Sequence, residues 1–291
     1  MKSINADQYT LLPADTVFPA AGTIACQGVK GAYSSLAAQK MFPGGTCLYF
    51  KTFQAVADAV AGGMCSFGIL PVENNIHGSV RSVYKILQEA KVHIVRSEDL
   101  LIHHCLLAKP GTSLKDIKKV YSHEQAIGQC TGFLKSLGDS VVPMPCLNTA
   151  VGARYVSETK DLDIAAISSP ECAEIYGLEV LKDGIADSDN NHTRFICISR
   201  DTVIYPGAGR ISLILSTRHT PGALYEVLGE FASLNLNLLK LESTPIPGKD
   251  FEFMFYIDIE ASAARPEVVS MLKRLSDVCP DYVFLGNYSG I

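Results

Sequence analysis

The sequence predicts a mixed α/β fold with two domains, and three observations support this. Strand-like and helix-like stretches alternate over about the first two thirds of the chain, which predicts a mostly parallel sheet covered by helices. The rhythm changes after residues 201–209, a proline- and glycine-containing stretch typical of a linker. Of the 291 residues, 47% are hydrophobic and 19% are charged, so each domain can bury a core.

The first part of the larger domain has the pattern of repeated βα units. Apolar runs predict strands at 23–28, 65–72 and 92–95. Between and after them, apolar residues recur at helical spacing, which predicts helices at 33–42, 53–60 and 80–87.

A second unit of the same kind follows. We expect strands at 100–108, 118–122, 163–168 and 194–199, and one helix at 124–137. Two similar α/β units in one domain predict two lobes.

The last 80 or so residues have a different element order. Alternating patterns predict strands at 210–217, 237–244, 251–260 and 281–288. Apolar positions at helical spacing predict helices around Leu228 and Leu272. The resulting order βαββαβ is that of the ferredoxin-like split unit, which leaves one sheet face for helices and an edge for self-pairing.

Composition excludes several classes of protein. A formal net charge of -5 argues against a general nucleic-acid binder. No apolar run reaches the roughly 18 residues of a membrane span, and the start of the chain lacks the unbroken apolar region of a signal peptide. Nine scattered cysteines without a C-x-x-C pair fit a reducing, cytoplasmic location.

No metal site is expected from the spacing of ligand-type residues. The seven histidines show no ligand spacing, and His103 and His104 would point to opposite faces of the strand predicted at 100–108.

Several turns share a design that suits a small anion. Small or polar residues stand between a strand end and a helix start at 31–34, 74–79, 122–125 and 148–150. Helix N-termini carry free N–H groups that bind carboxylates or phosphates, and such turns gather at the carboxyl ends of strands. Any one turn fits ordinary capping better. The four together favour an anion-binding cleft.

Two polar stretches are candidates for chemistry. Residues 190–194 (NNHTR) stand just before an apolar strand, where Arg194 would grip a carboxylate and Thr193 would donate a hydrogen bond. The same stretch also fits a polar loop with an incidental arginine. Glu73 follows another strand and suits a general base, although its spacing fits a carboxylate at a helix start better.

Taken together, these motifs resemble the prephenate dehydratase family with a C-terminal ACT domain. The first domain resembles the family's G-T-Y-S turn, its P-V-E-N-S, S-H-P-Q-A and A-A-I-S-S blocks and its T-R-F motif; the corresponding residues are 31–34, 71–80, 122–130, 165–181 and 190–195. The second domain resembles the family's G-A-L and E-S-R-P motifs at 219–228 and 241–244.

The resemblance implies a fold and an activity. It implies a two-lobed catalytic domain over 22–200, similar to type II periplasmic binding proteins, and an ACT regulatory domain over 208–291. The implied reaction converts prephenate to phenylpyruvate in phenylalanine biosynthesis, without a metal or an organic cofactor. Feedback inhibition by L-phenylalanine and a homodimer or homotetramer are also implied.

The resemblance also assigns the site residues, which fall into three groups. The catalytic group is Thr193, Arg194 and Glu73. The substrate-binding group is Tyr33, Ser34, Asn74, Ser79, Ser122, His123, Gln125, Thr149 and Phe195. The phenylalanine-binding group is Gly222, Ala223, Leu224, Glu242 and Ser243.

The chain departs from the family pattern at four positions. Val29 and Glu124 stand where the family often has proline, and Asn148 stands where serine is common. Thr244 replaces the arginine of E-S-R-P, so we expect one contact near the phenylalanine-binding residues to be missing. Only about twenty residues precede the first predicted strand, so we expect no fused chorismate mutase domain.

Three other interpretations stay open at this point. Arogenate dehydratase would perform the same chemistry on the amino-acid form of the substrate. A non-catalytic amino-acid- or anion-binding protein could keep the fold, although the intact Thr193-Arg194-Phe195 argues against it. A secreted solute receptor would need an export signal.

Overall fold

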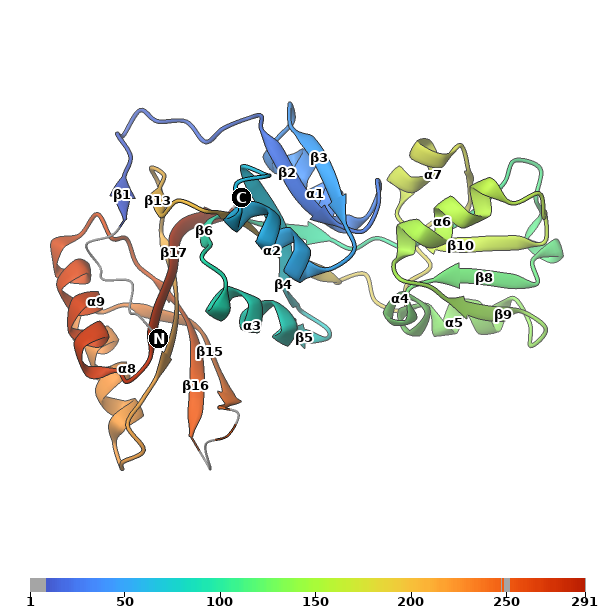
Figure 1. The fold of residues 1–291 in the computed structure, drawn as a ribbon. Helices are drawn as coiled ribbons and strands as arrows, with labels where there is room; N and C mark the ends of the chain where they lie inside the picture. Colours follow the sequence, from blue (N-terminus) through green and yellow to red (C-terminus); the bar gives the residue numbers. More distant parts are fainter. Residues whose placement is uncertain (1–8, 247, 249–251, 291) are drawn as a thin grey trace.

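The computed structural model describes residues 9–246, 248 and 252–290. It confirms the mixed α/β architecture, with two lobes followed by a βαββαβ domain (Figure 1). The first lobe lies in the middle, between the second lobe and the C-terminal domain (Figure 1).

The first lobe is a sheet covered by three helices. Its strands are β2 (Thr23–Gln27), β3 (Thr46–Phe50), β4 (Phe67–Asn74), β5 (Gly78–Ser79), β6 (His93–Leu101) and the returning β12 (His192–Ser199). Its helices are α1 (Tyr33–Met41), α2 (Phe53–Ala61) and α3 (Arg81–Glu89). The strand order is β6-β12-β4-β2-β3, with β2, β3 and β4 parallel and β12 antiparallel to both neighbours. The sequence pattern missed β3, a short edge strand whose side chains are only partly buried.

The second lobe has its own five-stranded sheet in the order β11-β7-β10-β8-β9. Its strands are β7 (Cys105–Ala108), β8 (Lys119–Ser122), β9 (Val142–Pro145), β10 (Ile164–Ser168) and β11 (Glu179–Lys182). Its helices are η1 (Leu114–Asp116), α4 (Glu124–Gln129), α5 (Thr131–Ser136), α6 (Thr149–Glu158) and α7 (Pro170–Tyr176).

Two predicted elements of this region are divided. The strand expected at 100–108 is two strands, because β6 ends in the first lobe and β7 begins in the second after the crossing residues 102–104. His103 and His104 therefore lie on the crossing segment and not on a strand. The helix expected at 124–137 is interrupted at Cys130, which has non-helical dihedral angles.

The C-terminal domain has the predicted βαββαβ order. Its elements are β14 (Arg210–Ser216), α8 (Ala223–Ser233), β15 (Asn237–Pro245), β16 (Phe253–Glu260), α9 (Pro266–Val278) and β17 (Tyr282–Gly290). The strands pair antiparallel in the order β15-β16-β14-β17, and α8 and α9 pack on one face. Phe251, which was expected to begin the strand predicted at 251–260, lies outside the described residues.

The C-terminal domain is joined to the first lobe through its sheet. The end of β17 pairs in parallel with β6, so the two sheets are continuous. The sheet face away from α8 and α9 shares a core with the first lobe, in which Tyr256 and Leu285 pack with Val83 and Tyr84. The stretch expected as a linker at 201–209 contains β13 (Val203–Ile204), which pairs with β1 (Thr10–Leu11).

No helix in the described part of the chain is both long and apolar enough to cross a bilayer.

Candidate active site

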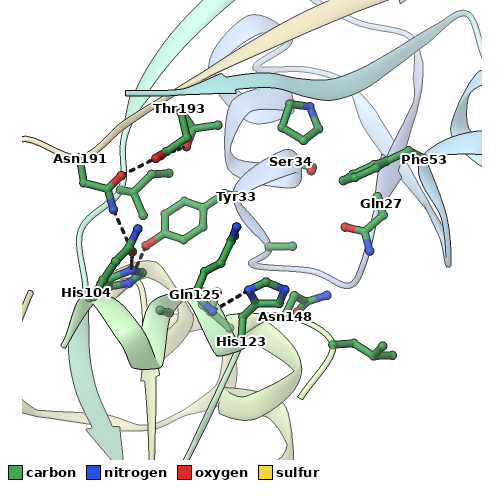
Figure 2. A pocket seen from close by; sticks show the side chains of 18 residues that line it. Gln27, Tyr33, Ser34, Phe53, His104, His123, Gln125, Asn148, Asn191 and Thr193 are labelled. Atoms are coloured by element: carbon green, nitrogen blue, oxygen red, sulfur yellow. Dashed lines mark hydrogen bonds between the residues drawn. The ribbon is translucent and has the colours of Figure 1, made fainter. Parts of the chain in front are cut away.

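A cavity of about 330 Å³ lies between the two lobes. This volume suits a small organic molecule. Figure 2 shows side chains from both lobes converging on it. The first lobe, with its crossing segments, contributes Gln27, Ala32, Tyr33, Ser34, Phe53, Pro71, Asn74, Ile102, Asn191 and Thr193. The second lobe and its start contribute His104, His123, Gln125, Ala126, Gln129, Leu147, Asn148 and Thr149.

Helix starts form much of the cavity wall. The first residues of α1, α2 and α6 line it, so free N–H groups of three helices lie at its edge. At α6 the side chain of Asn148 caps the helix by accepting from the Val151 N–H at 2.8 Å. Helix N-termini stabilise negative charge, so this wall suits an anion.

The Thr193 hydroxyl lies in the cavity with a defined hydrogen-bond partner. The Asn74 side-chain amide donates to Thr193 Oγ1 at 2.9 Å, across a register pair of β4 and β12. The other end of Asn74 is fixed, because its Oδ1 accepts from the backbone N–H groups of Ile76 and His77 at 3.0 and 2.9 Å. The amide therefore presents its NH₂ to Thr193, which leaves the hydroxyl proton free to be donated elsewhere.

The same amide begins a chain of polar contacts around the cavity. Asn74 donates to Asn191 Oδ1 at 2.7 Å, and Asn191 donates to Gln129 Oε1 at 3.0 Å. Gln129 Oε1 also lies 2.9 Å from His104 Nε2. These contacts join both lobes, the crossing residues 102–104 and the segment 183–191 that leads back to β12 into one network (Figure 2).

Burial disfavours the protonated form of both cavity histidines. Burial lowers the pKa of His104, and the hydrogen bond to Gln129 opposes this only in part. Burial also lowers the pKa of His123, whose Nδ1 accepts from the Gln125 N–H at 3.3 Å. The amide oxygen of Gln129 can only accept a hydrogen bond, so His104 donates to it from Nε2. The neutral ring therefore carries its proton on Nε2.

The cavity wall holds neither a cation nor a carboxylate. None of the described residues that line it is Lys, Arg, Asp or Glu. An anion would therefore be held by helix N-termini and by neutral amide, hydroxyl and imidazole groups.

The family model for prephenate dehydratase matches residues 24–203, which include both lobes and the strand that carries Thr193. The chain belongs to the prephenate dehydratase family. Among curated proteins, it is 36% identical over 282 residues to arogenate dehydratase/prephenate dehydratase 1 of Arabidopsis thaliana. That alignment covers 91% of this chain and 71% of the relative.

Two solved structures give the same architecture. The prephenate dehydratase of Arthrobacter aurescens in complex with L-Phe matches with a TM-score of 0.83 and 28% identity, over 92% of this chain and 90% of that one. GqqA, described as a novel type of quorum quenching acylase, matches with a TM-score of 0.83 and 34% identity, over 92% and 98% of the two chains.

Seven of the residues assigned from the prephenate dehydratase motifs meet at the cavity. They are Tyr33, Ser34, Asn74, His123, Gln125, Thr149 and Thr193. Two others are buried beside it: Ser122 donates to the Ile167 carbonyl at 2.7 Å, and Phe195 packs in the first-lobe core.

Three assigned residues lie elsewhere, which corrects their expected placement. Arg194, Glu73 and Ser79 were expected at the substrate, but none of them lines the cavity. Arg194 Nη2 instead contacts Glu73 at 2.8 Å and Asp258 of the C-terminal domain at 3.1 Å. The physical reason is strand alternation: Thr193 and Arg194 are neighbours on β12, so their side chains point to opposite faces.

Sequence reasoning missed several cavity residues. Gln129 and Asn191 stand inside motifs that were recognised, namely SHEQAIGQC and NNHTRF, but neither was assigned a role. His104 was treated as a strand residue. The sequence showed only that these residues are polar and stand near assigned residues. That does not distinguish a side chain in a cavity from one exposed to solvent.

The residues assigned to phenylalanine binding in this family do not all line one pocket. Gly222, Ala223 and Leu224 line a surface pocket of about 590 Å³ together with His219 and Phe253. Glu242 and Ser243 are on β15 and do not line that pocket. The Glu242 carboxylate instead accepts a hydrogen bond from Ser79.

One group in the described part of the chain offers three ligand atoms of the kind that bind a cation. Donor atoms of His103, Cys105 and Asp183 lie within 4.8 Å of one another, outside the cavity wall. They also contact one another: Asp183 Oδ1 lies 2.6 Å from His103 Nε2 and 2.9 Å from Cys105 Sγ. The expectation of no metal from sequence spacing overlooked this group, because Asp183 is far from the other two in sequence.

Proposed function

We propose that the protein converts prephenate to phenylpyruvate, and that the Thr193 hydroxyl assists departure of the ring hydroxyl. The observation that carries this proposal is the Asn74–Thr193 hydrogen bond, which leaves the hydroxyl proton free in a cavity lined by helix starts.

The reaction requires little from the protein. The bond between the ring and its carboxylate breaks, its electron pair enters the ring, and the ring hydroxyl leaves as hydroxide, which takes up one proton from solvent to give water. Carbon dioxide and an aromatic product result, so aromatisation drives the step. No electrons are exchanged with an outside acceptor, and we accordingly propose no organic cofactor.

A hydrogen bond to the leaving oxygen is the contribution that the enzyme must make. An alcohol is too weak an acid to protonate this oxygen before it leaves. A donor in place can stabilise the charge that develops there, and one such donor is worth about 10²–10³ in rate. Thr193 is a hydroxyl donor on the cavity wall whose own oxygen is already hydrogen-bonded.

The two carboxylates of prephenate would bind at the helix starts. The starts of α1 and α6 line the cavity from different lobes, and Gln125 and His123 add side-chain groups to its wall. Binding to both lobes would keep water out of the cavity and favour loss of CO₂ from a desolvated carboxylate.

Arogenate is the second candidate substrate, and the cavity chemistry favours prephenate. Arogenate carries an ammonium group where prephenate carries a keto group. An ammonium group is best matched by a carboxylate, and none of the described cavity residues is Asp or Glu.

Acyl hydrolysis, which the description of GqqA raises, fits the cavity less well. Nucleophilic acyl transfer by serine or threonine needs a base within hydrogen-bond reach of the hydroxyl. Among the described residues, none of the serine or threonine hydroxyls that line the cavity is hydrogen-bonded to a histidine.

We also propose a division of the chain and a mode of control. Residues 22–200 would form the catalytic domain and 208–291 an ACT regulatory domain that binds L-phenylalanine. Because Glu242 and Ser243 do not line the pocket formed by Gly222–Leu224, we propose that a second copy of the chain completes the site, as in a homodimer or a homotetramer. The nine free cysteines agree with a reducing, cytoplasmic location.

The test is turnover of prephenate and of arogenate by the full chain, followed by product identity. We expect phenylpyruvate from prephenate, and suppression of turnover by L-phenylalanine. Preferential conversion of arogenate to phenylalanine would replace the substrate assignment. Turnover of neither, with release of an acyl group from an N-acyl amide, would overturn the proposal.

A further inference from the structure

A cluster of charged and polar side chains, buried at Arg194 and Asp258, joins the C-terminal domain to the two strands that carry Asn74 and Thr193. We call it the interdomain cluster; its members are Glu73, Ser79, Arg194, Lys240, Glu242 and Asp258. Three of these come from the first lobe and three from β15 and β16 of the C-terminal domain.

The cluster contacts β4 and β12 one residue away from the proposed hydroxyl donor. Strand register pairs Thr193 with Asn74 and Arg194 with Glu73. Because side chains alternate along a strand, the first pair faces the cavity and the second pair faces the C-terminal domain. One face of the β4–β12 pair therefore carries the Thr193 hydroxyl, and the opposite face carries the interdomain cluster.

Among the described residues, the C-terminal domain contacts each of the two strands through a charged side chain. On β12, Asp258 Oδ2 accepts from Arg194 Nη2 at 3.1 Å. On β4, Lys240 Nζ donates to Glu73 Oε1 at 2.8 Å. Arg194 and Glu73 are themselves 2.8 Å apart, which closes the arrangement across the two strands.

The contact between Arg194 and Asp258 is shielded from water, whereas the Glu73 side chain is 36% exposed. The Arg194 side chain is 11% exposed and that of Asp258 is 0% exposed. Burial alone would lower the pKa of Arg194, but Asp258, Tyr288 and Glu73 outweigh it and the net shift is upward. The Asp258 carboxylate is fixed from behind by Ser212, whose hydroxyl donates to Oδ1 at 2.5 Å.

We infer that Arg194 and Asp258 are a positioning pair: the C-terminal domain holds β12 through Arg194 and thereby fixes the Thr193 hydroxyl for the proposed reaction. Lys240 and Glu73 do the same for β4 and Asn74. The inference rests on the proposed function and assigns Arg194 a role away from the substrate.

The physical basis is that small displacements matter at a reacting centre. Misplacement of a group by about 1 Å can cost roughly 100-fold in rate. Removing one partner of a buried charge pair leaves the other without compensation, so the strand that bears it must shift or admit water. A change in the C-terminal domain that moves β16 would reach Thr193 by this route.

The first experiment changes Asp258 and Ser212, which lie in the C-terminal domain and outside the cavity. Asp258→Asn removes the charge and should lower kcat on prephenate by roughly 10- to 100-fold, with KM changed by less than about threefold, since the helix starts still bind the carboxylates. Ser212→Ala only loosens Asp258 and should act in the same direction, but less. Arg274→Gln is the matched control, because it breaks an exposed ion pair with Glu230 in the same domain and should leave kcat unchanged.

A second measurement separates positioning from mere stability. Amide exchange in the peptide 190–198 should speed up in Asp258→Asn and Ser212→Ala under conditions where the rest of the first lobe stays protected. Arg194→Gln combined with Asp258→Asn should cost no more in kcat than the worse single variant, because the two residues act as one unit.

Three results would overturn the inference: lowered melting temperature with unchanged kcat, a double variant whose losses multiply, or unchanged amide exchange at 190–198. If the wild-type protein turns over neither prephenate nor arogenate, the proposed function fails. Amide exchange then still decides whether Asp258 holds β12.

Discussion

The orientation of one amide decides what the Thr193 hydroxyl can do. Asn74 is held by two backbone N–H groups at its oxygen and so donates to Thr193 through its nitrogen. The hydroxyl must then use its proton on another acceptor, and the substrate's leaving oxygen is the acceptor that we propose.

Asn74→Asp replaces the NH₂ donor beside Thr193 with a carboxylate oxygen, which accepts, and hardly changes the shape of the side chain. The carboxylate would accept the Thr193 proton, so the hydroxyl would no longer be free to donate to substrate. We expect kcat to fall about 100-fold or more, and KM to rise because a negative charge enters an anion site. Steady-state kinetics on prephenate would measure both.

The neighbouring Asn75→Asp serves as the control. Asn75 lies outside the cavity and contacts the 190–192 backbone, so kcat should change far less. Equal losses in the two variants would contradict the role given to Asn74.

His104 makes stability depend on pH. Burial lowers the pKa of His104, whereas in the unfolded chain it titrates near its ordinary value of about 6.5. As pH falls below that value, His104 becomes protonated in the unfolded state but stays largely unprotonated in the folded state. The free energy of unfolding therefore decreases. Urea unfolding at pH 7 and pH 5 should show a smaller decrease for His104→Gln than for the wild-type protein. An equal decrease would show that His104 does not contribute.

The residue scale also shows where sequence reasoning fell short. Thr193 and Arg194 were assigned to the same site from one motif, yet adjacent strand residues face opposite ways. The alternation was visible in the sequence. The ion-pair partner Asp258, 64 residues away on another domain, was not.

At the scale of elements, the helix starts are the anion-binding device. Asn148 both caps α6 and lines the cavity. Asn148→Ala should lower the free energy of unfolding by about 1 kcal/mol and raise KM for prephenate roughly two- to fivefold as the first turn frays.

Asn148→Ser tests the capping explanation directly. Serine restores an acceptor at the cap and should bring both stability and KM back toward wild type. A serine variant as defective as the alanine variant would mean that Asn148 acts through its amide contact with substrate and not through α6.

Elements were predicted well where the apolar pattern was long, and less well at edges and crossings. The βαββαβ order of the C-terminal domain was predicted because each of its elements has a long, regular pattern. The edge strand β3 was missed, and residues 100–108 were merged into one strand although the chain changes lobes at 102–104. The pattern of apolar residues predicts which positions are buried, but it does not predict which sheet a strand joins.

At the scale of the whole molecule, Gly286 is where the C-terminal sheet meets the first lobe. It lies on β17 with φ of 151°, and an added Cβ would come within 2.1 Å of the Ile94 carbonyl oxygen. Gly286→Ala should therefore lower the free energy of unfolding by about 3 kcal/mol or more. Chemical denaturation of the full chain would measure the loss.

Gly229→Ala is the matched control in the same domain. Gly229 is inside α8, and an added Cβ would meet nothing within 4 Å. Alanine there should stabilise the protein by about 0.5–1 kcal/mol. A Gly286 variant as stable as this control would contradict the close packing of β17 on β6.

The two lobes and the C-terminal domain could be predicted from the sequence, but their joining could not. The pattern predicted a linker at 201–209 between the two domains. The structure instead shares one core and one continuous sheet between the first lobe and the C-terminal domain. Such sharing depends on which apolar face meets which, and a single sequence carries no signal for that.

The most direct test of the account compares Thr193→Ala with Thr193→Ser in turnover of prephenate, with circular dichroism to check folding. We predict that alanine lowers kcat by about 10²–10³ with little change in KM, and that serine, which keeps the hydroxyl, retains most of the activity. A folded alanine variant with near wild-type kcat would contradict the proposal that the Thr193 hydroxyl assists departure of the ring oxygen.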